Sequence, residues 1–263
     1  MANIELREIS KVFTTEVAPF VAVRDLSLEV SDKELVSLIG PSGCGKTTIL
    51  NVIAGFLEPT SGEIRIDGGR IKDRESVCGV VFQADSVFPW MSVRKNIGYG
   101  LAVQGMPKKE RENVVEKYLH LVGLTNFADD WPRKLSGGMK KRVDLARAYA
   151  ANPEILLLDE PFGSLDVLTK ESMQMLLLRI WQAEKKTIVL VSHDIEEAIF
   201  LSHRVVVMTP SPGTINRTFD IPFEMPRDPS LKLSLEFLEL RRQIVEALTA
   251  QNGTQTIAPL LQR

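Results

Sequence analysis

Residues 35–47 read LVSLIGPSGCGKT, a short apolar run followed at once by a glycine-rich loop that ends in lysine and threonine. The apolar run predicts a buried strand, and residues 46–54 predict the helix that follows the loop. Glycines let the backbone curl so that several N–H groups point inward, and the start of the helix adds a partial positive charge. The stretch therefore predicts a phosphate-binding strand–loop–helix unit in an α/β fold.

The loop matches the pattern G-x-x-x-x-G-K-[ST], in which the lysine and the hydroxyl residue have separate tasks. Lys46 can reach the β- and γ-phosphates of a nucleotide, and the Thr47 hydroxyl can ligate Mg²⁺. We therefore expect a nucleotide bound together with Mg²⁺, and the family resemblance given below implies that this nucleotide is ATP. The expected nucleotide contacts in this part of the chain are Gly40, Pro41, Ser42, Gly43, Cys44, Gly45, Lys46, Thr47 and Thr48.

Two carboxylates come directly after another apolar run, in residues 155–160, which read ILLLDE. In open α/β sheets the ligands lie at the carboxyl ends of the strands, so both side chains are expected at that edge. Asp159 is then placed to hold the Mg²⁺ shell, and Glu160 to act as the general base that polarises the attacking water. Without the phosphate loop upstream, the same pair could simply cap the following turn.

Short apolar runs alternate with helical patterns along the chain, which indicates a largely parallel sheet covered by helices. Residues 89–151 give no strong strand signal and predict a helical insertion. Further strands are expected at residues 63–67, 77–82, 187–192 and 204–208, and further helices at residues 108–121, 139–151 and 231–248.

Composition narrows the class of protein. The 263 residues are 44% hydrophobic, enough for a substantial core, and the net charge of −2 does not favour a general nucleic-acid binder. No run approaches the roughly 20 apolar residues of a membrane-spanning helix, and the N-terminus lacks the apolar segment of a secretory signal. With only Cys44 and Cys78, a reducing cytosolic compartment is the natural interpretation. We expect Cys44, beside Lys46 and a helix start, to be the more reactive thiol.

The order of the remaining motifs resembles that of the ATPase subunits of ABC (ATP-binding-cassette) transporters. Residues 135–139 read LSGGM, similar to the family's signature LSGGQ, and the helical stretch KKRVDLARAYA follows. Gln83 in VVFQ resembles the Q-loop glutamine, the SLD of residues 164–166 the D-loop, and His193 in VSHD the switch histidine. The likeness covers the chain up to about residue 215 and includes the separations between the motifs.

The resemblance implies a P-loop NTPase (RecA-like) core with a mostly parallel sheet, an inserted helical subdomain and a small antiparallel β part. It divides the chain into residues 1–88 (first part of the core), 89–152 (helical signature subdomain), 153–222 (second part of the core) and 223–263 (C-terminal helical tail). Phe13, in KVF, resembles the aromatic residue that stacks on adenine. An apolar core role is the alternative for Phe13, and Phe20 or Val21 could lie against the base instead.

The resemblance also implies roles for the polar residues. Gln83 would contact both Mg²⁺ and the attacking water, so the expected metal site comprises Thr47, Gln83 and Asp159. His193 would contact the γ-phosphate and keep Glu160 and water in line. The expected catalytic residues are therefore Glu160, His193 and Gln83.

In the family two copies sandwich each ATP between the phosphate loop of one copy and the signature of the other. Ser136, Gly137 and Gly138 precede a helix, so their N–H groups and the serine hydroxyl form a second anion site. Such a site would be redundant in one ATPase domain unless it served a neighbouring copy, identical or a close paralogue. Met139 replaces the glutamine that the family's signature usually has. This puts in doubt only a polar contact of that side chain with the nucleotide or with the opposite copy.

Residues 87–91 (VFPWM) resemble a segment of the nitrate/sulfonate/taurine/bicarbonate importer group. The likeness implies a small-anion importer with two transmembrane permease subunits, indirectly an external substrate-binding protein, and no nucleic acid. The chain would lie peripherally on the cytoplasmic face of the inner (plasma) membrane. Phe88, Trp90 and Met91 are expected to face the permease's coupling helix, with ordinary core packing as the alternative. Importers of pyrimidine-type vitamin precursors and of aromatic acids contain similar segments.

We weigh two other classes against a transporter. Soluble ABC-type ATPases of DNA repair insert long heptad-repeat arms before the signature, and those of translation carry two cassettes in one chain. This sequence shows no such heptads, and each motif occurs once. A P-loop kinase or other phosphotransferase would not explain the LSGG motif.

Overall fold

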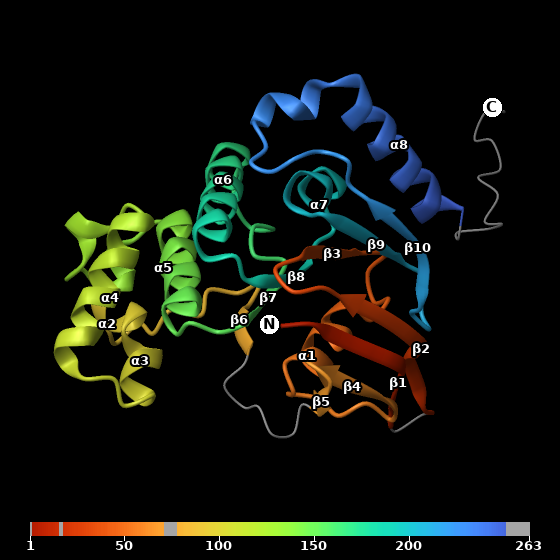
Figure 1. The fold of residues 1–263 in the computed structure, drawn as a ribbon, viewed down its shortest axis with the longest axis horizontal. Helices are drawn as coiled ribbons and strands as arrows, with labels where there is room; N and C mark the ends of the chain where they lie inside the picture. The colour runs from red at the N-terminus through yellow and green to blue at the C-terminus, as the bar shows by residue number, and fades with distance from the viewer. Residues whose placement is uncertain (1, 16–17, 71–77, 251–263) are drawn as a thin grey trace, which may run out of the picture.

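The computed structural model describes residues 2–15, 18–70 and 78–250, whose strands form two sheets (Figure 1). The antiparallel sheet has the order β2-β1-β4-β5, and the six-stranded sheet the order β10-β9-β3-β8-β7-β6. Within the second sheet only β10 is antiparallel to its neighbour. The strands are β1 (Ile4–Phe13), β2 (Phe20–Val30), β3 (Leu35–Ile39), β4 (Ser61–Ile66), β5 (Gly69–Arg70), β6 (Cys78–Val81), β7 (Ile155–Asp159), β8 (Thr187–Val191), β9 (Arg204–Met208) and β10 (Ile215–Asp220). The expected mostly parallel sheet and small antiparallel part are both confirmed.

The parallel sheet separates two hydrophobic cores. Successive side chains of a strand point to opposite faces, so Val36 and Leu38 of β3 join one core and Leu35 and Ile39 the other. On the first face α1 (Lys46–Ile53) packs between the two sheets. The second face is covered by α6 (Val167–Glu184), α7 (Ile195–Leu201) and α8 (Leu235–Thr249), which Figure 1 shows above the sheet. Strands buried on both sides form nearly continuous apolar runs, which is why such runs located them in the sequence.

The stretch between β6 and β7 contains helices and no strand in its described part, as expected for residues 89–151. It comprises α2 (Val93–Ile97), α3 (Tyr99–Val103), α4 (Lys108–Leu121) and α5 (Gly137–Ala150), with short 3₁₀ turns at Thr125–Phe127 and Pro132–Lys134. Figure 1 shows these helices to one side of the sheets. Of this group, α5 packs against β6 and α6, so α5 and the chain after β6 connect the insertion to the core.

Several boundaries differ from the sequence-based expectation, and two of the differences have a local cause. The helix expected over residues 231–248 is a 3₁₀ turn, Pro229–Leu233, followed by α8, because the Ser234 hydroxyl accepts a hydrogen bond from Phe237 N (3.2 Å) and caps a new helix. α5 begins at Gly137 rather than 139, since Ser136 is its N-cap. The expected strand at 77–82 begins at residue 77, outside the described residues. Within the described ranges no helix is long and apolar enough to cross a membrane.

Candidate active site

The phosphate loop connects β3 to α1. Gly43 and Gly45 have φ values of 76° and 94°, a region that glycine tolerates and other residues rarely adopt. A Cβ atom on Gly45 would also lie 2.6 Å from the Val23 side chain. The ammonium group of Lys46 donates to the carbonyl oxygens of Gly40 (2.9 Å) and Pro41 (3.0 Å), which keeps it within the curl of the loop.

A cavity of about 580 Å³ opens over this loop, within the size range of small-molecule and cofactor sites. Besides the loop, three distant parts of the chain line it, represented by Phe13, Glu160 and His193. The full lining is Phe13, Phe20, Ala22, Gly40, Ser42, Gly43, Gly45, Lys46, Thr47, Thr48, Glu160 and His193. Phe13 and Phe20 are direct partners across β1 and β2, so both rings stand at the same end of the cavity.

Thr47 and Asp159 face each other beside the loop. The Thr47 hydroxyl donates to Asp159 Oδ1 at 3.2 Å. Burial raises the pKa of the Asp159 carboxyl, and the neighbouring Glu160 charge adds to this, while the Thr47 hydrogen bond and the Lys46 charge oppose it. A carboxylate and a hydroxyl next to a phosphate site suit Mg²⁺, which takes few protein ligands and completes its shell with phosphate oxygens and water.

Two side chains meet one carboxylate oxygen of Glu160. Gln83 Nε2 donates to Glu160 Oε2 at 3.0 Å, and His193 Nδ1 lies 3.0 Å from the same oxygen. Gln83, Glu160 and His193 follow β6, β7 and β8, which are neighbours in the sheet, so their carboxyl ends converge. Glu160 has a φ of 44°, uncommon for a residue with a side chain, and its N–H donates to Val191 O (2.9 Å). Two side chains therefore contact the carboxylate, and the Glu160 backbone is tied to β8.

The signature residues lie away from this cavity. Ser136, Gly137 and Gly138 are not among the residues that line it, and Ser136 is exposed at the start of α5. Its hydroxyl accepts from Met139 N at 3.3 Å, as an N-cap does. The structure thus brings the loop, Asp159, Glu160, Gln83, His193 and Phe13 together and leaves the signature on a separate surface.

The expectation of a reactive Cys44 thiol is wrong. The loop turns the Cys44 side chain into the core, where it is fully buried. A Cβ atom on Gly40 would lie only 2.7 Å from Cys44 Sγ, which shows how closely the sulfur is packed. Only the backbone of Cys44 can serve as a nucleotide contact.

Sequence reasoning missed Gly213, which braces the phosphate loop from behind. Gly213 N donates to Ala22 O (2.9 Å), and Arg24 N donates to Gly213 O (3.0 Å), so the segment is tied to β2. A Cβ atom at this position would lie 1.8 Å from Cys44 O, so only glycine fits. The SPG sequence at 211–213 signals a turn, and nothing local in it indicates contact with a loop 170 residues earlier.

Neither cysteine is expected to react quickly with N-ethylmaleimide in the native protein at neutral pH. Cys44 is buried, and burial raises the pKa of the Cys78 thiol to about 12, so little of the reactive thiolate forms there. Mass spectrometry should show an unmodified native chain and a doubly modified chain in denaturant. Rapid modification of the native parent that a Cys44→Ser variant lacks would mean that this sulfur reaches solvent.

Comparison with known proteins adds independent findings. The family described as ABC transporter matches residues 23–163. The taurine import ATP-binding protein TauB of Roseobacter denitrificans is 45% identical over 224 residues, 85% of this chain and 84% of that protein. The nitrate import ATP-binding protein NrtD of a Synechocystis species is 42% identical over 262 residues, 97% and 98% of the two chains. A solved dimeric ATP-binding cassette in a post-hydrolysis state, bound to ADP and phosphate, superimposes with a TM-score of 0.74 at 31% identity, covering 84% of this chain and all of that one.

Proposed function

The chain belongs to the ABC transporter family as an ATP-hydrolysing cassette, and from that premise we propose that it energises an importer of a small anion such as nitrate, sulfonate, taurine or bicarbonate. The observation that carries this proposal is the likeness, over most of their lengths, to ATP-binding proteins of nitrate and taurine import. These relatives favour an importer over a soluble ATPase of DNA repair or translation.

We assign ATP to the cavity over the phosphate loop. The loop N–H groups and Lys46 would hold the phosphates, with the Lys46 ammonium group exchanging its two carbonyl partners for phosphate oxygens. Phe13 and Phe20 at the other end offer aromatic faces for adenine. We include Phe20 in this contact because it lines the cavity and pairs with Phe13 across β1 and β2.

For hydrolysis we assign Glu160 as the general base. Gln83 donates a hydrogen bond to one carboxylate oxygen of Glu160, and His193 contacts the same oxygen. The second oxygen is therefore available to water. Thr47, Gln83 and Asp159 are the residues that would hold Mg²⁺, whose charge would neutralise the phosphate oxygens. His193 would contact the γ-phosphate from the end of β8.

We further propose that two copies complete each site. Ser136, Gly137 and Gly138 present N–H groups and a hydroxyl at an exposed helix start and take no part in their own chain's cavity. The partner copy's γ-phosphate is the anion they would bind. In this arrangement residues 1–88 and 153–222 form the ATP-binding core, 89–152 the signature subdomain and 223–263 a helical tail, of which 251–263 lie outside the described residues.

The permease would contact the helical insertion near Phe88. The Phe88 ring packs on Trp90 (5.5 Å between ring centroids) and on Tyr99 (4.8 Å). Because Trp90 is 64% exposed, this cluster presents an aromatic surface to solvent. We place the protein peripherally on the cytoplasmic face of the membrane, with two permease subunits and, indirectly, an external substrate-binding protein.

The importer assignment is tested by uptake in the organism that carries this gene. Deleting the gene should abolish uptake of one labelled anion among nitrate, taurine, an alkanesulfonate and bicarbonate, and the parent gene should restore it. A Glu160→Gln copy should restore nothing, because the membrane subunits would be present but not energised. Undiminished uptake of all four anions in the deletion strain would refute the assignment to this substrate class.

A further inference from the structure

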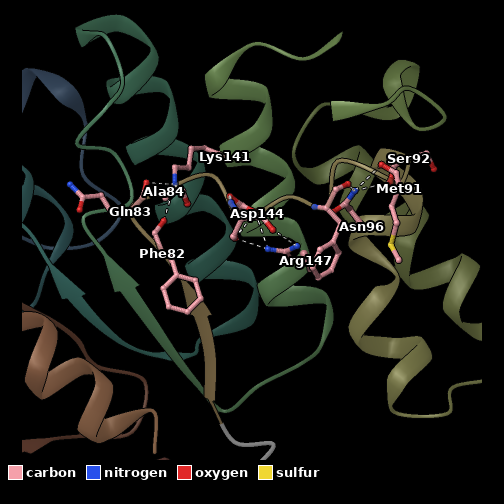
Figure 2. Close-up of polar contacts among 11 residues, drawn as sticks. Phe82, Gln83, Ala84, Met91, Ser92, Asn96, Lys141, Asp144 and Arg147 are labelled. Atoms are coloured by element: carbon pink, nitrogen blue, oxygen red, sulfur yellow. Dashed lines mark hydrogen bonds and ion pairs between the residues drawn. The ribbon is translucent and has the colours of Figure 1, made fainter. Parts of the chain in front are cut away.

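Lys141, on α5, is a lysine with almost no contact with water. It is 2% exposed, and its ammonium group donates to three successive carbonyl oxygens, those of Phe82 (2.8 Å), Gln83 (2.8 Å) and Ala84 (3.3 Å). Figure 2 shows this side chain reaching from α5 to the chain that leaves β6. An ammonium group has three N–H donors, so this set of acceptors satisfies it completely.

The same three residues include the glutamine of the active site. The backbone carbonyl of Gln83 accepts a hydrogen bond from Lys141, and the Gln83 side-chain amide donates one to Glu160 Oε2 (3.0 Å). Only one residue therefore separates Lys141 from the carboxylate that we assign as the base. A shift of the backbone at Gln83 would carry its amide away from Glu160.

Two further side chains of α5 hold the chain after Gln83. Residues three apart on a helix are neighbours on its surface, and Asp144 and Arg147 follow Lys141 in successive steps of three. Asp144 accepts from Ser86 N (3.2 Å) and Ser86 Oγ (2.9 Å), while Arg147 donates to Ser86 O (2.8 Å) and lies over the Phe88 ring, 4.8 Å from its centre. Figure 2 shows Lys141, Asp144 and Arg147 one after another on α5, with Phe82, Gln83 and Ala84 at the Lys141 end of the row.

The buried charges in this row are mutually compensated. Burial lowers the pKa of the Lys141 ammonium group, and the negative charges of Asp144 and Asp85 act in the opposite direction. Burial raises the pKa of Asp144, which hydrogen bonds from Ser86 and the charge of Arg147 oppose. A charged side chain is retained in a core only where such partners offset its desolvation. A neutral side chain could pack in the same space but could not donate to three carbonyls.

We propose that Lys141 is a positioning residue for ATP hydrolysis, which fixes the Gln83 backbone so that the Gln83 amide meets Glu160. This rests on the proposed role of Gln83 at the reacting centre. Lys141 lies on the helix that Ser136 caps, so one rigid element carries both the signature and the clamp on Gln83.

The test is a double-mutant cycle of steady-state ATPase rates. Lys141→Met keeps the aliphatic stem and removes the three donors, and should lower kcat by about 10-fold, as expected for a displaced positioning group, while KM for ATP stays within about twofold. In a Gln83→Ala background the same substitution should change kcat by less than about twofold, because the group through which Lys141 acts is already gone. Lys140→Met is the matched control, since Lys140 is the next residue and reaches the same segment through Asp85 (3.6 Å) from a partly exposed position. It should leave kcat unchanged.

The outcomes distinguish the role of Gln83 in hydrolysis from the positioning role of Lys141. If Gln83→Ala alone hydrolyses ATP at the parent rate, the role of Gln83 fails and the Lys141 proposal fails with it. If Gln83→Ala is slow but Lys141→Met lowers kcat equally in both backgrounds, Gln83 keeps its role and only the positioning proposal is overturned. Should Lys141→Met not fold, Lys141→Gln, which keeps two N–H donors, is carried through the same cycle, and the same comparison decides.

Discussion

Replacing Glu160 with glutamine should slow ATP hydrolysis by about 10²-fold or more while ATP still binds, since the general base is lost and the shape of the side chain hardly changes. The hydrogen bonds at Oε2 explain why binding should survive. Gln83 and His193 can both still approach an amide oxygen, and neither the phosphate loop nor Lys46 is altered. The measurement is phosphate release under saturating Mg-ATP, beside calorimetric titration of ATP.

A matched control is Glu196→Gln, which neutralises an exposed carboxylate on α7 whose partner is Arg241 (3.0 Å). Exposed ion pairs of this kind contribute about 0–1 kcal/mol, so activity should not change. If the Glu160→Gln variant hydrolyses ATP at nearly the parent rate, Glu160 is not the general base. No residue of the cavity is then assigned to that role.

Replacing Ser136 with arginine should have the second large effect. The bulky cation at the start of α5 would keep two copies from closing over ATP, so cooperative hydrolysis should fall by about 10²-fold or more as the donors to the γ-phosphate are withdrawn. ATP affinity of the isolated copy should stay within about twofold, since Ser136 lies outside its own chain's cavity. Ser234→Arg is the control, because it removes the equivalent cap of α8, worth about 1 kcal/mol, far from the signature.

Mixing variants sharpens the Ser136 experiment. A Ser136→Arg copy retains its phosphate loop, and a Lys46→Ala copy retains its signature. A mixed dimer would therefore contain one intact site, built from the loop of the first and the signature of the second. Partial recovery of hydrolysis on mixing two inactive proteins is expected. No recovery, together with weakened ATP binding by the Ser136 variant alone, would mean that the signature serves its own chain.

The parts of the fold that were predictable carry their signal locally. The strand Leu35–Ile39 and the helix Lys108–Leu121 lie where the apolar pattern placed them, because a strand buried on both faces is continuously apolar and a surface helix repeats every 3.6 residues. The phosphate loop was predictable for the same reason, since the glycines needed for its curl lie within eight residues of one another.

The strands β1 and β2 could not be placed because their alternation is interrupted. Their pairing contains register shifts, and Glu8 and Asp25 have φ values of 50° and 45°, so the side chains change face along each strand. The resemblance implied an antiparallel part, but periodicity gave no bounds for it. From the sequence, Phe13 and Phe20 were therefore only alternatives for the contact with adenine. In the structure they pair across the two strands and are neighbours.

The remaining surprises depend on contacts between distant segments. Cys44 has a cationic and helical sequence environment, yet the curl of the loop sends its side chain into the core against Met208. Lys141 and Asp144 look in the sequence like the charged face of an amphipathic helix. Their burial follows from residues 82–88 lying along that face, more than 50 residues away in the chain.

Sedimentation of the Glu160→Gln variant measures the two-copy site most directly. With saturating Mg-ATP it should sediment as a dimer, because the nucleotide bridging the phosphate loop and the partner copy's Ser136 is no longer hydrolysed, and with ADP it should sediment as a monomer. Adding Ser136→Arg to the same chain should leave it monomeric in ATP. A chain that binds ATP yet remains monomeric, or one that dimerises equally with ADP, would contradict an ATP site shared between two copies.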